Sequence, residues 1–292
     1  MTPPVFVAVR EPWGLVVVDG PDATSFLQSL VSQDLDPIAD GESAHSLLLS
    51  PQGKLDVDFR ITRVGDEWWL DTDADFGPRL AASLTRFRIR VKAEIDDRTD
   101  GSALLSVVGA VAPTVEGVRA LPGRWGDAAG VDLVGDAAAV AAARDAVDDS
   151  VARWTAEQLE AFRIEQGVPR LGVDVDEKTI PQEAFLEVDA VSFTKGCFLG
   201  QELVTRIDTR GHVNKYLRRL AVDGEVVPRR GASIEADGKA VGTVTSSASV
   251  PDDGRIVALG MVRREVEPPA EVTLRWDGGE ARAEVLASPT VV

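Results

Sequence analysis

The stretch that decides the fold of this chain reads Lys195-Gly196-Cys197-Phe198-Leu199-Gly200-Gln201-Glu202. Two glycines bracket the thiol, and the residues after Gly200 favour a helix, which would place Cys197 close to a helix N-terminus. The partial positive charge of that terminus, together with the ammonium of Lys195, would favour the reactive thiolate. The alternative is that the glycines form a tight turn and Cys197 is a small buried apolar residue.

The composition limits what this thiol can do. The 292 residues include 31 basic and 48 acidic side chains, a formal charge of −17, which disfavours direct binding to nucleic acid. Cys197 is the single cysteine, which excludes an intramolecular disulfide and a self-sufficient cysteine-rich metal or iron–sulfur site. Only His45 and His212 could be the base of a cysteine–histidine dyad. We therefore expect Cys197 to act alone or with a partner.

No apolar run is long enough to cross a membrane, and the N-terminal residues lack the pattern of a signal peptide. We therefore expect a cytoplasmic protein without a membrane partner.

The order of short elements predicts an α+β fold with mostly antiparallel sheets, because strands and helices mix without a strict βαβ rhythm. In the first two thirds of the chain we expect strands at 15–18, 46–49, 55–61, 67–71, 89–95 and 103–108. The expected helices are one that starts after Asp22 or Thr24, and those at 78–87, 137–147 and 155–166.

Beyond about Lys215 the pattern changes to short strands only, which predicts a separate C-terminal β-barrel domain. Two hairpin turns are expected within it, at Asp237-Gly238 and at Asp277-Gly278. The expected strands are 216–222, 232–236, 239–246, 256–262, 272–275 and 281–286.

A second informative segment, Arg163-Ile164-Glu165-Gln166-Gly167-Val168-Pro169, ends a predicted helix. A carboxylate just before a helix-stopping glycine can be held rigidly, and it can accept two parallel hydrogen bonds from one ligand. Glu165 is a candidate for such a contact. The competing interpretation is a solvated glutamate at the end of a helix.

The segment from Lys195 to Glu202 resembles the signature of the YgfZ family of folate-binding proteins, which are relatives of the aminomethyltransferase of glycine cleavage. The signature residues are Lys195, Gly196, Cys197, Phe198, Gly200, Gln201 and Glu202. The similarity continues at Pro181-Gln182, Arg206, Arg210-Gly211 and Asn214-Lys215, whereas His212 lies outside the family pattern.

The resemblance implies an aminomethyltransferase-like, three-lobed folate-binding fold with a C-terminal β-barrel domain. Residues 1–205 would form the folate-binding region, with one lobe of about 1–50 and 140–205 and another of about 51–139. Residues 206–292 would form the barrel.

The resemblance also implies site residues. Glu165 would grip the pterin ring of tetrahydrofolate or a one-carbon derivative, while Trp13 and Arg206 would contribute to the same cofactor site. Leu159 stands where the family pattern suggests a second aromatic residue, and Trp154 is a substitute.

Asp58 falls close to the catalytic aspartate of aminomethyltransferases, where a carboxylate could act as general acid or base. With Asp58, the expected catalytic residues are Cys197 and Lys195, and no metal site is expected. In the competing interpretation, Asp56, Asp58 and Arg60 line the solvated face of an amphipathic strand.

The function implied by the resemblance is tetrahydrofolate-dependent support of iron–sulfur cluster assembly or repair in client enzymes, including enzymes that modify tRNA. The expected partners are folate and iron–sulfur client or assembly proteins. If the chain is an enzyme, it would be a folate-dependent aminomethyl- or methyltransferase that uses Asp58. A third hypothesis is a non-catalytic, folate-sensing adaptor.

The region from Lys195 to Arg230 is locally basic. Its eight basic and four acidic residues give a net charge of 8 − 4 = +4, and such a region could attract a folate tail or an acidic partner surface.

Overall fold

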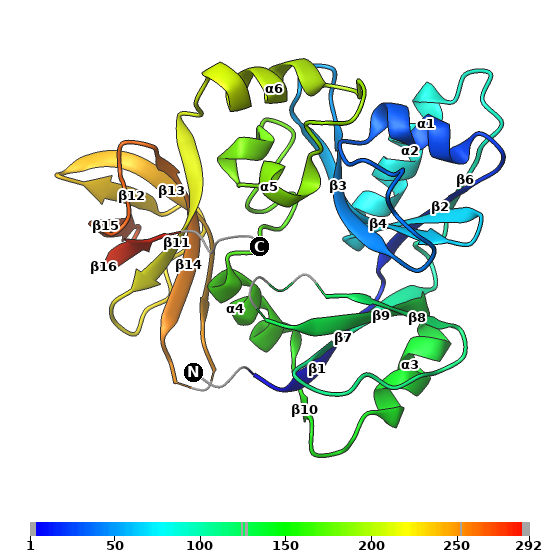
Figure 1. Cartoon of the computed structure of the whole chain (residues 1–292). Coiled ribbons are helices and arrows are strands. Elements are labelled where there is room, and N and C mark those ends of the chain that lie inside the picture. The colour runs from blue at the N-terminus through cyan, green and yellow to red at the C-terminus, as the bar shows by residue number, and fades with distance from the viewer. Residues whose placement is uncertain (1–3, 124, 126–127, 252, 288–292) are drawn as a thin grey trace. The chain divides into compact units, whose positions relative to one another are not determined.

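The computed structural model describes residues 4–123, 125, 128–251 and 253–287, and Figure 1 shows its helices and strands. The chain divides into two compact units. Unit 1 consists of Met1–Arg124, Ala128–Arg153 and Glu187–Thr205, and unit 2 consists of Trp125–Asp127, Trp154–Leu186 and Arg206–Val292. None of the helices in the described part of the chain combines the length and the apolar character needed to span a bilayer.

Unit 1 contains two five-stranded sheets. The first has the order β3-β4-β5-β2-β6 and is antiparallel throughout. Its strands are β2 (Gly14–Asp19), β3 (Ser43–Leu49), β4 (Leu55–Val64), β5 (Glu67–Thr72) and β6 (Glu94–Asp97). The helices α1 (Ala23–Leu30) and α2 (Gly77–Phe87), with the short 3-10 turn η1 (Ala74–Phe76), accompany this sheet. Its core includes the fully buried side chains of Leu27, Phe59 and Trp68.

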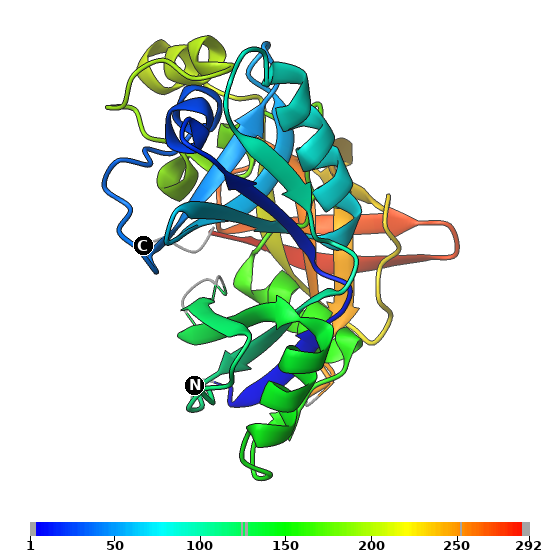
Figure 2. The same ribbon diagram turned by 90° about the vertical axis from the view of Figure 1, so that its right-hand side faces the viewer.

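The second sheet of unit 1 has the order β10-β1-β7-β9-β8. Its strands are β1 (Phe6–Arg10), β7 (Ser102–Val108), β8 (Val118–Pro122), β9 (Gly130–Asp136) and β10 (Ala152–Arg153). Helix α3 (Ala137–Ala146) covers one face of it, as Figure 2 shows, and buries Val140 and Ala143 against Leu105 and Leu133.

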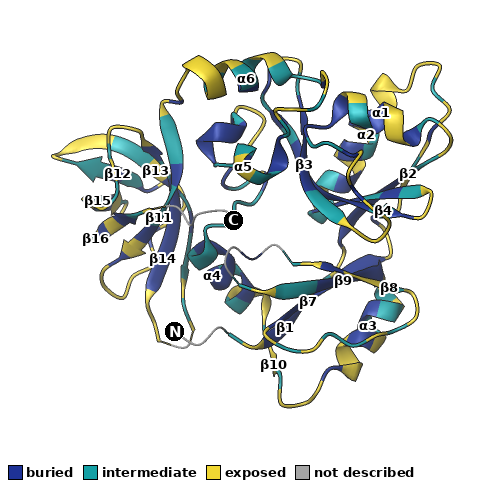
Figure 3. Cartoon of the chain, in the orientation of Figure 1, coloured by how far each residue is buried: buried dark blue, intermediate teal, exposed yellow. Residues whose placement is uncertain are grey.

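Unit 2 contains a closed six-stranded barrel in the order β11-β14-β13-β12-β15-β16. Its strands are β11 (Lys215–Val222), β12 (Ser233–Ala236), β13 (Lys239–Ser249), β14 (Ile256–Arg263), β15 (Ala270–Trp276) and β16 (Gly279–Leu286). Leu220, Ile234, Val244 and Leu274 are part of its buried core, and Figure 3 shows buried residues along β14.

The remaining elements are α4 (Ala156–Gln166), η2 (Pro181–Glu183), α5 (Glu187–Ala190) and α6 (Gln201–Arg210).

The expected fold class, α+β with a C-terminal barrel, is confirmed. Both predicted hairpin turns connect neighbouring strands, with Ala236 paired to Lys239 and Trp276 paired to Gly279. Asp237 and Gly238 have φ values of 51° and 72°, the left-handed conformation that a two-residue turn of this kind requires.

The strand expected at 89–95 is wrong in its position, because β6 begins only at Glu94. Residues 86–90 are exposed, and Arg90 has a φ of 58°, which is incompatible with an extended strand. Arg90 and Lys92, which belong to the expected strand but precede β6, are both exposed, and these cations favour solvent over a sheet.

Candidate functional site

The signature segment forms a loop that leads into α6, and Cys197 is exposed on it. Helix α6 begins at Gln201, so the thiol lies shortly before the helix, as predicted from the glycines around it. The alternative of a buried apolar cysteine is therefore wrong. The loop packs instead through Phe198, which is buried, and through Gly200.

Gly200 is required at its position. It has a φ of 77°, and a Cβ atom there would collide with the carbonyl oxygen of Ser50. Gly53 lies on the other side of the same contact, with a φ of 72°, and a Cβ atom on it would approach the carbonyl oxygen of Gly200 to 2.8 Å. The two glycines let the β3–β4 turn and the signature loop pack backbone against backbone.

Lys195 fixes the signature loop to the end of α1. Its Nζ donates hydrogen bonds to the carbonyl oxygens of Gln28 (2.7 Å), Val31 (2.9 Å) and Gln33 (2.8 Å). These are carbonyls that α1 and the turn after it leave without a helical partner, and a cation near a helix C-terminus is electrostatically favourable. The Lys195 ammonium also lies 5.5 Å from the centre of the Phe198 ring. This geometry assigns Lys195 an anchoring role.

Burial lowers the pKa of Lys195 to about 8, although the carboxylates of Asp34 and Asp36 act in the opposite direction. An unfolded lysine titrates near 10.4, so between about pH 8 and 10.4 the unfolded chain binds more protons at this residue than the folded chain does. The stability contribution of Lys195 must therefore rise with pH in this window.

We expect the gap in unfolding free energy between the wild type and Lys195→Met to widen between pH 7.5 and pH 10. The increase should be on the order of 1 kcal/mol, because the side chain is only partly buried. Urea unfolding at the two pH values measures it, with Lys178→Met, an exposed lysine, as the control. A difference in unfolding free energy that stays constant or becomes smaller with rising pH would contradict the lowered pKa of Lys195.

Asp58 is part of a group of three side chains that joins β3, β4 and α5. The imidazole of His45 contacts Asp58 Oδ1 through Nε2 at 2.6 Å and Asp189 Oδ1 through Nδ1 at 2.8 Å. The His45 side chain is 4% exposed, that of Asp58 15% and that of Asp189 35%. A neutral imidazole has one N–H, so two short contacts to carboxylates require a further proton on the ring or on a carboxyl group. The group can therefore hold a proton next to the partly accessible Asp58.

The competing interpretation of β4, a solvated face of Asp56, Asp58 and Arg60, is wrong for Arg60. That residue is buried and pairs with Asp71 at 2.8 Å and Asp132 at 3.0 Å. The reason is that Arg60, although it alternates with apolar residues along β4, lies on a face that is covered within unit 1. Its charge is therefore neutralised by buried carboxylates and not by solvent. Sequence reasoning considered His45 only as a possible base for Cys197, and it missed the contacts of His45 with Asp58 and Asp189. The signal for them is weak, since 144 residues separate the two.

Glu165 lies one residue before the end of α4, and its helix stops at Gly167 in the left-handed conformation, as predicted. The Glu165 side chain is 24% exposed, and its Oε1 lies 2.9 Å from Nη1 of Arg255. The backbone carbonyl of Glu165 accepts a hydrogen bond of 3.0 Å from Arg219. The carboxylate is therefore partly accessible and held in place, which differs from a freely solvated residue at a helix end.

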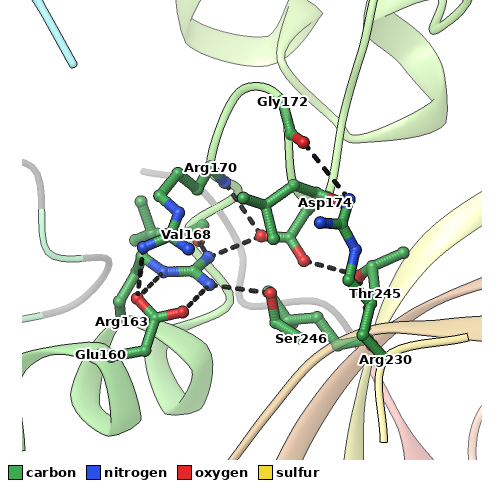
Figure 4. A network of polar contacts seen from close by, with 11 residues as sticks. Glu160, Arg163, Val168, Arg170, Gly172, Asp174, Arg230, Thr245 and Ser246 are labelled. Atoms are coloured by element: carbon green, nitrogen blue, oxygen red, sulfur yellow. Dashed lines mark hydrogen bonds and ion pairs between the residues drawn. The ribbon is translucent and has the colours of Figure 1, made fainter. Parts of the chain in front are cut away.

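Arg163, two residues before Glu165, organises the turn that follows α4 (Figure 4). Its guanidinium donates to Val168 O at 2.6 Å, Asp174 Oδ2 at 2.7 Å and Ser246 Oγ at 3.0 Å, and it pairs with Glu160 at 2.7 Å. Burial acts to lower the pKa of Arg163, but Glu160 and Asp174 outweigh it and the pKa is raised. The sequence had marked this segment without revealing that Arg163 is its structural centre.

The other predicted cofactor residues lie in different surroundings. Trp13 is buried in unit 1, where its ring packs against Leu104 and Val134 and its Nε1 donates to Asp71 at 3.1 Å. Arg206 is exposed on α6. Trp154 packs edge-on against Phe162 in unit 2, with ring centres 5.5 Å apart, and Leu159 is buried. Trp13 is thus a core residue with a satisfied N–H group, which does not fit an open stacking surface.

Two family models match the chain. The model described as the GCVT N-terminal domain matches residues 11–116, and that of the glycine cleavage T-protein C-terminal barrel domain matches residues 215–291.

Curated relatives extend over nearly the whole chain. The "tRNA-modifying protein YgfZ" of Cronobacter sakazakii is 27% identical over 301 residues, which is 94% of this chain and 90% of the relative. The protein of the same name from Klebsiella pneumoniae is 26% identical and covers 97% of this chain and 93% of its own length. Among solved structures, the glycine cleavage system aminomethyltransferase T of Bartonella henselae has the same fold, with a TM-score of 0.84 over 98% of this chain and 86% of that chain at 20% identity.

Proposed function

Because this chain belongs to the glycine cleavage T-protein-like superfamily and is related over its length to YgfZ proteins, we propose that it binds tetrahydrofolate and supports iron–sulfur clusters in client enzymes. The clients would include enzymes that modify tRNA, and the support would be the assembly or repair of their clusters. Cys197 would be the functional thiol.

The observation that carries this proposal is the exposed thiol on an anchored loop. The Lys195 ammonium and the backbone of Gly200 hold the loop on the two sides of Cys197, so the thiol has a defined position while remaining accessible. A cluster needs about four ligands, so a single cysteine is suited to a transient bond with a cluster or thiol that the client holds. Cys197 would thus act together with its partner.

The fit of folate rests on Glu165. A pterin ring presents an N–H and an adjacent amino group, and a carboxylate can accept both as parallel hydrogen bonds. Glu165 already pairs through Oε1 with Nη1 of the Arg255 guanidinium, and the exposure of this pair permits a ligand to share or replace it. Arg206 remains a candidate for contact with the folate tail. Bound tetrahydrofolate would supply or accept a one-carbon unit.

A second candidate function, a one-carbon transferase, is favoured by one specific observation. The Asp58 carboxylate contacts His45, which also contacts Asp189, and an acid or base of this kind can exchange a proton with a bound amine.

The third hypothesis, a folate-sensing adaptor, has less support. Arg218 lies over the rings of Phe185 and Tyr216, and Arg219 bonds Glu165 O and Ala287 O, so these cations of the basic region are engaged within unit 2.

Tetrahydrofolate binding tests the proposal directly. We expect Glu165→Gln to weaken tetrahydrofolate affinity by about tenfold or more, because a charge-assisted pair of hydrogen bonds becomes a mismatched amide contact. Isothermal titration calorimetry under reducing conditions measures it, with the exposed Glu225→Gln as matched control. In a host that lacks its own copy, the activity of an iron–sulfur tRNA-modifying enzyme should fall in parallel. Equal folate affinity of wild type and Glu165→Gln would remove Glu165 as the pterin contact.

A further inference from the structure

A cavity of about 550 Å³ lies in unit 2, between the turn that follows α4 and three strands of the barrel. Residues 172–176 and 179 form one wall, and the other comes from β11, β13 and β14. Val262 belongs to the barrel core, so its neighbours Met261 and Arg263 point to the outer face of the barrel. The volume of the cavity falls in the range of small-molecule sites.

The wall formed by the turn is built rigidly (Figure 4). Both carboxylate oxygens of Asp174 are used inside the protein: Oδ2 accepts from Arg163 at 2.7 Å and from the N–H of Arg170 at 3.0 Å, and Oδ1 accepts from Thr245 at 2.6 Å. Arg230 Nη2 donates to Val173 O at 2.9 Å and to Gly172 O at 3.3 Å. These contacts hold the turn against β13, and they place the Arg230 cation at the cavity.

Two further cations line the cavity in an arrangement that is unfavourable by itself. Lys215 on β11 and Arg263 on β14 are direct partners in the antiparallel register, and like charges opposite one another destabilise a sheet. Glu183 approaches Lys215 only to 3.9 Å. In the described part of the chain, no carboxylate comes within ion-pair distance of the guanidinium of Arg230 or Arg263. Asp176 also lines the cavity, but its Oδ1 accepts hydrogen bonds from Lys178 N and from Thr179.

We propose that this cavity binds a compact organic anion with two or more phosphate or carboxylate groups. Lys215, Arg230 and Arg263 would pair with the anionic groups, and an anion between Lys215 and Arg263 would convert their repulsion into attraction. Val175, Val241 and Met261 give the lining an apolar part that suits the body of the ligand. Glu165 is not among the lining residues, so this site is distinct from the proposed pterin contact and does not rest on it.

Binding of two probes tests the site and distinguishes a phosphate ligand from a carboxylate ligand. ATP represents the oligophosphates, and a γ-linked tri-glutamate peptide represents the oligocarboxylates. We expect one of them to bind the wild-type protein at low salt with a Kd below about 1 mM, to weaken as salt rises, and to lose affinity at least about tenfold in Arg263→Gln. Tighter binding of ATP would identify a phosphate ligand, and tighter binding of the peptide a carboxylate ligand.

Arg263→Glu distinguishes lost binding from lost folding. It places a carboxylate opposite Lys215, so the Tm of the free protein should stay the same or rise by about 1 °C, while the rise in Tm that the probe causes in the wild type disappears. Arg282→Glu makes the same charge change on β16, whose residues do not line the cavity, and should keep the probe-dependent rise. Failure of both probes to bind the wild type, or equal binding to wild type and Arg263→Gln, would overturn the proposal.

Discussion

Replacing Cys197 by serine is expected to lower the activity of the iron–sulfur client by about tenfold or more while tetrahydrofolate affinity stays unchanged. The hydroxyl of serine is similar in size but is neither a thiolate nor a ligand for soft metal ions, so it cannot form a transient bond to a cluster or a client thiol. The side chain is exposed, so the fold should not change. Client activity in a host without its own copy and calorimetric folate titration of the purified variant together measure the effect.

Two matched variants make the Cys197 prediction specific. Thr194→Ser, on the same loop and also exposed, should retain full client activity. Asp58→Asn should retain it as well if the thiol carries the function, because the carboxylate belongs to a different group of residues. Loss of activity in Asp58→Asn with retention in Cys197→Ser would instead establish the one-carbon transferase and reject the thiol-centred function.

Arg163→Met is expected to destabilise unit 2 by about 3–5 kcal/mol. The substitution removes the guanidinium that pairs with the fully buried Asp174 and bonds Val168 O, and it leaves a buried carboxylate without its charge partner. The methionine fills much of the volume but supplies no donor. The free energy of unfolding obtained from urea titration at neutral pH, followed by circular dichroism, measures the loss.

Arg170→Met is the control for this network. Arg170 also pairs with Glu160, at 3.2 Å, but its side chain is 42% exposed, so its loss should cost less than about 1 kcal/mol. A cost for Arg163→Met no larger than that of Arg170→Met would contradict the central role of Arg163. Both variants should leave the signature loop of unit 1 unaffected, which the labelling rate of Cys197 by a thiol reagent reports.

The sequence was sufficient where the deciding interactions are local. The turns at Asp237-Gly238 and Asp277-Gly278, the end of α4 at Gly167 and the start of α6 after Gly200 follow from the backbone preferences of a few neighbouring residues. The change to short strands only beyond about Lys215 similarly indicated a barrel. The same local reasoning failed at residues 89–92, which form a largely exposed segment before β6 and not the first part of a strand.

Only part of the candidate site could be predicted from the sequence. The signature segment and Glu165 stood out as residues, but the contacts that give them their properties come from distant parts of the chain. Lys195 was expected to act on the thiol two residues away. In the folded chain its ammonium is bound by carbonyls more than 160 residues away in sequence, because a buried cation requires several oxygen partners.

The α+β class, the C-terminal barrel and the segment around Cys197 could be predicted because they depend on strand and helix patterns and turn chemistry within short windows. Only the folded chain shows that Cys197 is exposed, that His45 joins Asp58 to Asp189, and that Lys215 pairs with Arg263 on the neighbouring barrel strand. The physical reason is that burial and charge pairing depend on which strands become neighbours. That choice is made by packing of the whole chain and leaves no local pattern in the residues that it brings together.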